Sequence, residues 1–250
     1  MSIFARQPGV PFSKSNPVSF ALIIIITSAY IANSLSNNAL FSIGYLQGHR
    51  VVYGGEWWRL FTVMLLHGNL MHFAFNTFFG IYVIGSALER LVGAWRYFIF
   101  FLLGGLLASW TVVGWDIAFD NFTPTIGASG AIFALLGALL WVTIHRSSWL
   151  DPNDISAIKT FVLINVIFTF IGGNISIPGH IGGLIAGYLL AMIIPINRPY
   201  TSRRNKMFND PFEQTHIDPG SLDDIDEVDV VDDDDDDDDP FKKTYKDYLN

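Results

Sequence analysis

Long uncharged apolar runs, separated by short polar segments, dominate the first 200 residues. A membrane-spanning helix needs about 20 mostly apolar residues, because its length must match the hydrocarbon core of the bilayer. Four runs are long enough to span the bilayer on their own. The fifth reaches this length only if the preceding residues from about Ile155 are included, and the sixth is short. The runs lie at about residues 19–36, 61–88, 97–115, 125–144, 160–173 and 181–197. We therefore predict an all-α, polytopic membrane protein with a bundle of six membrane-spanning helices.

The charges are divided unevenly along the 250-residue chain. Residues 1–200 carry nine Lys/Arg and six Asp/Glu, a net charge of +3, whereas residues 201–250 carry six and seventeen, a net charge of −11. The front part falls far below the roughly 25% of charged residues found in soluble domains, which excludes an ordinary water-soluble fold there. We expect a cytoplasmic segment at 1–18, a membrane domain at 19–197 and a cytoplasmic acidic tail at 198–250.

The basic residues also predict the orientation, because cytoplasmic loops are enriched in Lys and Arg. With the N-terminus inside, ten Lys/Arg fall in inside segments, and only Arg50 and Arg59 fall outside. The first run lacks a small-residue cleavage site, which favours an uncleaved span over a signal peptide. We expect a multi-pass integral protein of a bacterial plasma membrane with both termini in the cytoplasm.

The tail contains an unbroken run of aspartates, Asp232–Asp239. Such a block repels itself and buries too little apolar area to fold, so we expect a disordered tail. Its simplest role is solubility, and the alternatives are weak divalent-cation binding or docking of an unknown partner. The chain has no cysteine, which excludes a thiolate nucleophile and a Cys-ligated metal. No nucleic-acid-binding motif is present, so we expect no nucleic-acid partner.

A few polar side chains interrupt the apolar runs, where they are costly and therefore indicate function. They are His67, His72, Asn76, Ser129 and His180. With an inside N-terminus, the second, fourth and sixth spans all begin at the outer side of the membrane. The five residues then start in one leaflet at similar depth, although three separate helices contribute them. This arrangement is what an active site between helices needs.

Small residues recur every four positions after Ser129 and after His180, so each set forms a stripe along one face of its helix. This spacing lets membrane helices approach each other closely. Packing one stripe against the other would bring Ser129 and His180 together at the same depth. The stripe residues are Gly130, Ala134 and Ala138 in the first helix and Gly183 and Gly187 in the second.

These residue types suit nucleophilic catalysis. A serine hydroxyl attacks poorly until a neighbouring base takes its proton, and a neutral imidazole is the natural base near pH 7. His72 and Asn76 are four residues apart, so they share a helix face and can donate hydrogen bonds toward one oxygen. The backbone N–H of Ser129 at a helix start can join them. No carboxylate is positioned for a triad, so we interpret Ser129 and His180 as a dyad.

Other readings of these residues find less support. A zinc metalloprotease would show His-Glu-x-x-His, whereas His67 and His72 are five apart with no Glu between them. A three-histidine site with His180 lacks a nearby carboxylate, and His67 also fits a packing role. An aspartyl intramembrane protease or a proton-coupled transporter would place carboxylates within the spans. We expect no metal and no cofactor.

Together these residues resemble the rhomboid family of intramembrane serine proteases. The likeness covers about residues 50–190, with the motifs in the family's order. A single motif would be weak, but several in order are specific. The matching elements are Trp58-Arg59, His67-x4-His72-x3-Asn76, Glu89-Arg90, Gly127-Ala128-Ser129-Gly130, and His180-Ile181-Gly182-Gly183 with Gly187.

The resemblance implies that Ser129 is the nucleophile and His180 the general base. It implies that His72, Asn76 and the Ser129 N–H donate to the oxyanion, and that residues 37–58 form a loop in the outer leaflet. Supporting roles follow for His67, Gly127, Gly130, Gly183, Gly187, Phe133, Trp58 and Arg59. Phe133 departs from the family, which often has Tyr there; it keeps the ring and loses the hydroxyl.

The leading hypothesis is hydrolysis of peptide bonds in or near transmembrane segments of membrane proteins, most simply single-span ones. The substrate helix must unwind locally, and the resemblance implies a small side chain at the cleavage position. The first alternative is a catalytically inactive relative that binds and escorts membrane clients, which retention of Ser129 and His180 disfavours. The second is a channel or transporter, against which the lack of intramembrane carboxylates argues.

Overall fold

The structure is a computed structural model that describes residues 2–5, 8–173 and 175–196. Within these ranges every regular element is a helix, and the only β feature is an isolated bridge between Leu46 and Thr125. The all-α prediction is therefore confirmed for this part, while the predicted acidic tail at 198–250 lies outside the described residues. In chain order the elements are α1 (Phe12–Ser15), α2 (Pro17–Leu35), α3 (Ala39–Gly44), α4 (Gly48–Val52), α5 (Arg59–Thr62), η1 (Val63–Leu65), α6 (Leu70–Ala74), η2 (Phe75–Gly85), α7 (Ser86–Val92), α8 (Ala94–Ala118), α9 (Ser129–His145), η3 (Ser147–Trp149), α10 (Pro152–Ile171) and α11 (Ile177–Ile193).

In the described part of the chain, four helices are long and apolar enough to cross a membrane. They are α2, the helix Leu70–Val92 that α6, η2 and α7 form together, α8 and α10. The apolar helices α9 and α11 are shorter, with 17 residues each. Large apolar side chains are exposed on these helices, such as Leu35 on α2 and Ile171 on α10. Such a surface suits lipid rather than water and indicates an integral membrane protein. Six spans remain a prediction.

Two helix boundaries correct the sequence prediction. The apolar run at 61–88 does not form one helix, since the long helix begins at Leu70 and His67 lies in the preceding loop. The Asn69 side chain accepts the N–H of His72 at 2.8 Å, which caps the new helix start. Helix α8 extends beyond the predicted run at 97–115 at both ends, so Asp116 lies inside it, and the Asp116 carboxylate accepts the N–H of Gly48 at 2.7 Å.

Helix α9 is the centre of the bundle, and most of its residues are buried. It packs between α8 and α11, and the two predicted small-residue stripes do meet. A Cβ at Gly183 would overlap the carbonyl of Gly130, and one at Gly187 would overlap the carbonyl of Ala134. Side chains at these positions would force the helices apart, so the glycines set the close approach of α11 to α9.

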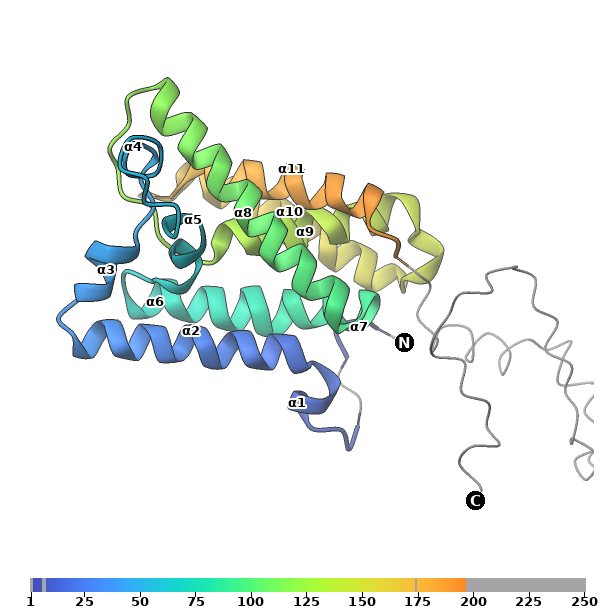
Figure 1. Cartoon of the computed structure of the whole chain (residues 1–250). Coiled ribbons are helices and arrows are strands. Elements are labelled where there is room, and N and C mark those ends of the chain that lie inside the picture. The colour runs from blue at the N-terminus through green and yellow to red at the C-terminus, as the bar shows by residue number, and fades with distance from the viewer. Residues whose placement is uncertain (1, 6–7, 174, 197–250) are drawn as a thin grey trace, which may run out of the picture. The chain divides into compact units, whose positions relative to one another are not determined.

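The short helices α3, α4, α5 and α6 gather at one end of the bundle (Figure 1). At the opposite end, α7 lies near the start of α2, and the two are joined by a buried carboxylate. Glu89 accepts the backbone N–H groups of Val18 at 2.8 Å and Ser19 at 2.9 Å. These donors belong to the first turn of α2, where no helical acceptor is available. Glu89, whose acidic position the sequence motif includes, therefore connects α7 to the start of α2 through two hydrogen bonds.

Candidate active site

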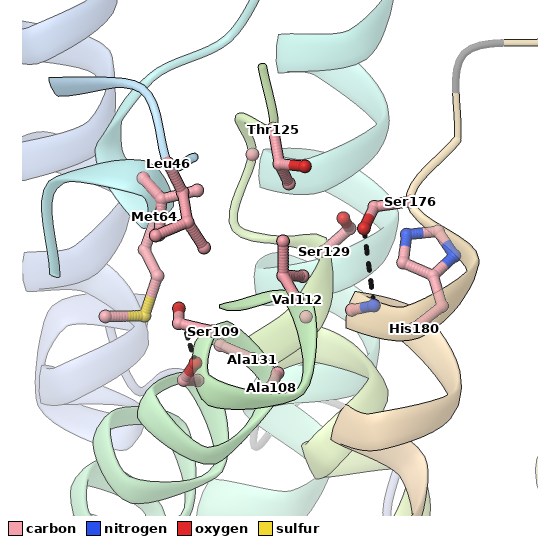
Figure 2. Close-up of a pocket in the computed structure, with 15 residues that line it drawn as sticks. Leu46, Met64, Ala108, Ser109, Val112, Thr125, Ser129, Ala131, Ser176 and His180 are labelled. Atoms are coloured by element: carbon pink, nitrogen blue, oxygen red, sulfur yellow. Dashed lines mark hydrogen bonds between the residues drawn. The ribbon is translucent and has the colours of Figure 1, made fainter. Parts of the chain in front are cut away.

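Ser129 and His180 line one pocket at the end of the bundle where α9 and α11 begin. Ser129 is the first residue of α9, and His180 lies in the first turn of α11. The imidazole of His180 faces the side of the pocket that holds Ser129 and Ser176 (Figure 2). The contact of the Gly130 and Gly183 stripes explains this meeting, because it aligns the two helix starts at one level.

The segment that leads into Ser129 is held by backbone hydrogen bonds to the loops of α3 to α6. Leu46 and Thr125 exchange N–H···O bonds of 2.9 and 2.8 Å, and Gly127 donates its N–H to the carbonyl of Val63 at 2.9 Å. Gly127 has φ = +120°, a conformation that favours glycine. As the first helical residue, Ser129 has a backbone N–H without a helical acceptor, which is therefore free to bind an anion.

The imidazole of His180 is held on its flat face by Phe133. The two rings are stacked, with centroids 4.0 Å apart and planes 20° apart. A phenylalanine at this position therefore stacks on His180 through its ring alone. Nδ1 of His180 lies 2.9 Å from the hydroxyl oxygen of Thr169 on α10. The imidazole is therefore contacted by Phe133 on its face and by Thr169 at its edge.

His72 approaches Ser129 from α6. A Cβ built at Gly127 would lie 2.7 Å from Nε2 of His72 and 3.6 Å from Oγ of Ser129, so both side chains border the same glycine. Asn76 is buried, and its Nδ2 donates to the carbonyl of His72 at 2.8 Å. Its Oδ1 has no hydrogen-bond partner among the described residues. The amide retains a second N–H, so Asn76 can still donate one hydrogen bond.

His67 lies behind His72 and away from the pocket lining. It is 2% exposed, its ring meets that of His72 edge-on at 5.1 Å, and it also borders Phe73. Neither ring nitrogen finds a hydrogen-bond partner in the part of the chain that the structure describes. Its position favours a packing role against His72. No group of three or more His, Asp or Glu residues suited to a metal occurs among the described residues.

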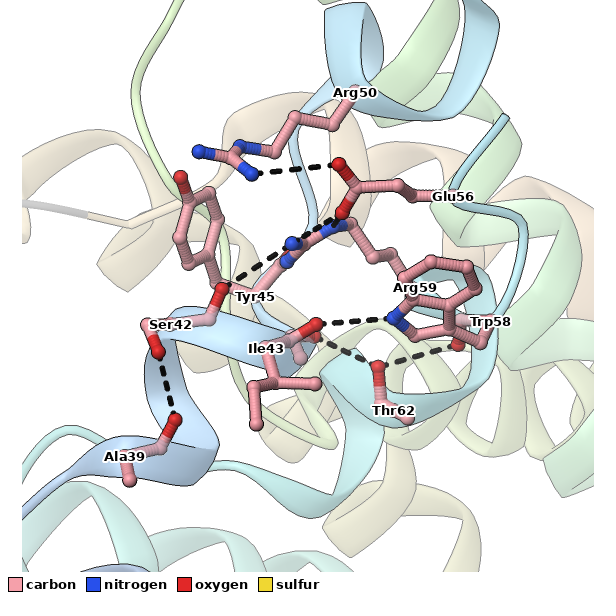
Figure 3. Close-up of polar contacts among 10 residues, drawn as sticks. Ala39, Ser42, Ile43, Tyr45, Arg50, Glu56, Trp58, Arg59 and Thr62 are labelled. Carbon is pink, nitrogen blue, oxygen red and sulfur yellow. Dashed lines mark hydrogen bonds and ion pairs between the residues drawn. The ribbon is translucent and has the colours of Figure 1, made fainter. Parts of the chain in front are cut away.

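Trp58 and Arg59 lie outside the pocket and organise the loop that carries α3 and α4 (Figure 3). The Trp58 indole donates to the carbonyl of Ile43 at 3.0 Å. The Arg59 guanidinium is 2% exposed and donates to the Glu56 carboxylate at 2.6 Å, the Tyr45 carbonyl at 2.6 Å and the Ser42 carbonyl at 3.2 Å. Its role is therefore structural, since it satisfies loop carbonyls that the helices leave open.

Three residues at or near the site make contacts that the sequence did not predict. Glu56 pairs with Arg59, and its only sequence signal was a carboxylate three residues before an arginine. Ser176 precedes α11, caps it by accepting the N–H of Gly179 at 3.3 Å, and lines the pocket. A serine before Ile-Pro-Gly is an N-cap signal that could have been used. Thr169 has no sequence signal, because its contact depends on how α10 packs.

Comparison with known proteins assigns the chain to a family. Residues 54–196 match the family model of the Rhomboid domain. The chain is 39% identical over 137 residues to rhomboid protease GluP of Bacillus subtilis, a match covering 55% of this chain and 26% of that protein. It is 33% identical over 142 residues to the putative rhomboid protease YdcA of the same organism, covering 57% and 69%.

A more distant relative is rhomboid protease GlpG of Pectobacterium atrosepticum, 25% identical over 184 residues, with 71% of this chain and 63% of that protein covered. The chain thus spans about a quarter of the length of GluP and larger parts of the other two. The matched domain covers more than half of the chain and contains His72, Asn76, Ser129 and His180. The chain therefore belongs to the rhomboid family of proteases, which are integral membrane proteins.

Proposed function

We propose that this chain is an intramembrane serine endopeptidase in which Ser129 is the nucleophile and His180 the general base. The observation that carries the proposal is that a serine and a histidine from separate helices line one pocket, at the level where both helices begin. A nucleophile and a base brought together in this way form the minimal unit for acyl transfer. The family membership supports the same reaction.

In the first half of the reaction, Nε2 of His180 takes the proton of Ser129 as Oγ bonds to the scissile carbonyl carbon. The resulting imidazolium gives this proton to the nitrogen of the leaving amine, and the C–N bond breaks. In the second half, a water molecule attacks the acyl-enzyme and loses a proton to Nε2. That proton returns to Oγ as the ester bond to Ser129 breaks, which restores the resting enzyme.

Each tetrahedral intermediate carries a negatively charged oxygen, which hydrogen-bond donors must stabilise. The N–H of Ser129 at the start of α9 has no helical acceptor, and the helix dipole also favours negative charge there. The His72 ring and the Ser129 hydroxyl both border Gly127, and Asn76, which bonds to the His72 carbonyl, retains a second N–H. We assign these three groups to the oxyanion, with donors fixed before the charge develops.

The proposed substrates are transmembrane segments of membrane proteins, with single-span proteins as the simplest class. The pocket walls beside Ser129 are small or apolar, including Met64, Ala108 and Val112, which suits a small side chain at the cleavage position. The distribution of Lys and Arg supports an orientation with both termini in the cytoplasm and the pocket in the outer leaflet. The acidic tail has no part in this chemistry.

The test is cleavage of single-span substrates by the full chain reconstituted in liposomes. Wild-type protein should release product, Ser129→Ala and His180→Ala should not, and Ser148→Ala should cleave as wild type does. Ser148 is a matched control because it is exposed in the short helix η3, between α9 and α10. Undiminished cleavage by Ser129→Ala would refute the proposal, and no cleavage by wild type of any membrane substrate would favour an escort protein.

A further inference from the structure

Thr169 on α10 holds the side of the candidate base that faces away from Ser129. Its Oγ1 lies 2.9 Å from Nδ1 of His180, and the residue is only 1% exposed. The same hydroxyl donates to the carbonyl of Asn165, one turn earlier on α10, at 2.9 Å. The three groups form a chain from the backbone of α10 through a hydroxyl to the imidazole on α11.

The direction of this chain follows from counting hydrogens. A threonine hydroxyl carries one hydrogen and two acceptor lone pairs. Because that hydrogen is donated to the Asn165 carbonyl, Oγ1 meets the imidazole as an acceptor. His180 must then carry its proton on Nδ1 and donate it to Thr169. In a neutral imidazole this leaves the lone pair on Nε2, the nitrogen that has to take the proton of Ser129.

We propose that Thr169 is a positioning residue, whose hydroxyl accepts the Nδ1–H of His180 and so holds the base in the tautomer and rotation that activate Ser129. This inference rests on the proposed function of the dyad. In a Ser-His-Asp triad a carboxylate occupies the corresponding place and holds the imidazole by the same hydrogen bond. Here the acceptor is neutral, so no uncompensated charge is buried inside the membrane domain. The Nδ1 proton stays in place throughout, while the transferred proton moves on Nε2.

A purely structural explanation of Thr169 has to be considered, because threonines in helices often bond to the carbonyl four residues earlier. Thr143 on α9 does this with Leu139 at 2.8 Å, and Thr77 does it with Phe73 at 2.8 Å. Thr169 differs from both by having a second partner on another helix. The partner is the one histidine that lines the pocket with Ser129.

The placement of Thr169 on its helix also favours a role toward His180. The buried residues of α10 are Asp154 and Ile158 near its start and Thr169 near its end, while much of the surface between them is exposed. A buried polar residue at the last turn of an otherwise lipid-facing helix costs free energy unless it is paired. The Asn165 carbonyl pairs the hydroxyl hydrogen, and the contact with Nδ1 adds a partner for an oxygen lone pair, which ties the orientation of the base to the packing of α10 against α11.

The experiment compares three variants of the full-length protein in liposomes, with kcat and KM measured separately on a cleavable single-span substrate. Thr169→Val keeps the shape and removes the hydroxyl, Thr169→Ser keeps the hydroxyl, and Thr143→Val makes the same change at a threonine bonded only within its own helix. In triad enzymes, loss of the group that fixes the tautomer costs up to about 10⁴-fold in kcat. For a neutral acceptor we expect Thr169→Val to lower kcat by about 10- to 100-fold, with KM nearly unchanged.

Recovery of activity by the serine variant distinguishes a role of Thr169 in positioning His180 from a role in folding. Thr169→Ser should recover kcat to within about threefold of wild type, and Thr143→Val should match wild type. The rate at which a fluorophosphonate labels Ser129 should fall in Thr169→Val by a factor similar to kcat, because both reactions need the activated hydroxyl. Thermal unfolding in detergent identifies any variant that simply fails to fold.

The outcomes distinguish this inference from the proposed function. If Ser129→Ala abolishes cleavage but Thr169→Val retains wild-type kcat, the dyad stands and the role of Thr169 is refuted. Equal loss in Thr169→Val and Thr169→Ser, or a rise in KM alone, would also overturn it, because the hydroxyl would then not matter to the base. If Ser129→Ala still cleaves, the proposed function fails first, whatever Thr169 does.

Discussion

The ring of Phe133 lies parallel to the imidazole of His180, with the two centroids 4.0 Å apart. Phe133 is itself 3% exposed and sits one turn after Ser129 on α9. The helix that begins at Ser129, the proposed nucleophile, therefore also provides the surface against which His180, the proposed base, rests. Stacking of this kind is worth about 0.5–1.5 kcal/mol beyond burial.

This stack gives the first prediction. Phe133→Leu keeps most of the apolar volume and removes the flat ring, so His180 should sample more orientations and kcat should fall about 2- to 10-fold, with little change in KM. Phe133→Tyr should retain wild-type kcat, because the ring is kept. Steady-state kinetics on a single-span substrate measures both, and equal activity of the leucine variant would show that the stack does not position the base.

The second prediction concerns the approach of α11 to α9. A methyl group at Gly187 would collide with the carbonyl of Ala134, so Gly187→Ala should lower the free energy of unfolding by about 1–3 kcal/mol and separate Ser129 from His180. The matched control is Gly114→Ala on α8, where an added Cβ meets nothing within 4 Å. That variant should be neutral or stabilised by up to about 1 kcal/mol. Thermal unfolding in detergent compares them, and a stable, active Gly187→Ala would contradict the packing described.

The third prediction concerns the oxyanion. His72→Ala removes one of the proposed donors to the oxyanion, so kcat should fall about 10²- to 10³-fold while KM changes little. His145→Ala is the control, because His145 ends α9 at the far end of the helix from Ser129, is exposed and stacks on Trp141. A change in KM alone for His72→Ala would place His72 in substrate binding instead.

The fourth prediction concerns the loop of α3 and α4. Arg59→Lys cannot reproduce three hydrogen bonds in fork geometry, so the free energy of unfolding should fall by about 2–3 kcal/mol. Limited proteolysis should then cut the loop at 37–58 faster than in wild type. Arg50→Lys, at a half-exposed pair with Glu56, should change stability by less than about 1 kcal/mol. Equal protease resistance in both variants would show that Arg59 does not organise the loop.

Much of this structure follows from local patterns in the sequence. Apolar runs predicted the long helices, because a membrane helix needs a continuous apolar stretch. The small-residue spacing predicted that Gly183 would meet the region of Gly130, since close approach leaves a recognisable four-residue repeat. Ser129 and His180 were singled out as candidates because polar residues are rare in such stretches.

What the sequence could not supply depends on caps and on packing between helices. An apolar run does not reveal a break, so the cap at Asn69 that leaves His67 in a loop was missed. Thr169 is an ordinary residue in an apolar helix, and its contact with His180 depends on the rotation of α10, which has exposed apolar residues on most sides. The link between Glu56 and Arg59 required the fold of the intervening turn.

The central claim is that Ser129 is the nucleophile and that His180 activates it. Its most direct test is mass spectrometry of the reconstituted protein after reaction with a fluorophosphonate, which maps the modified residue. We predict a single adduct on the peptide that contains Ser129, absent in Ser129→Ala and strongly reduced in His180→Ala. An adduct on another residue, or undiminished labelling of Ser129 in His180→Ala, would contradict the account.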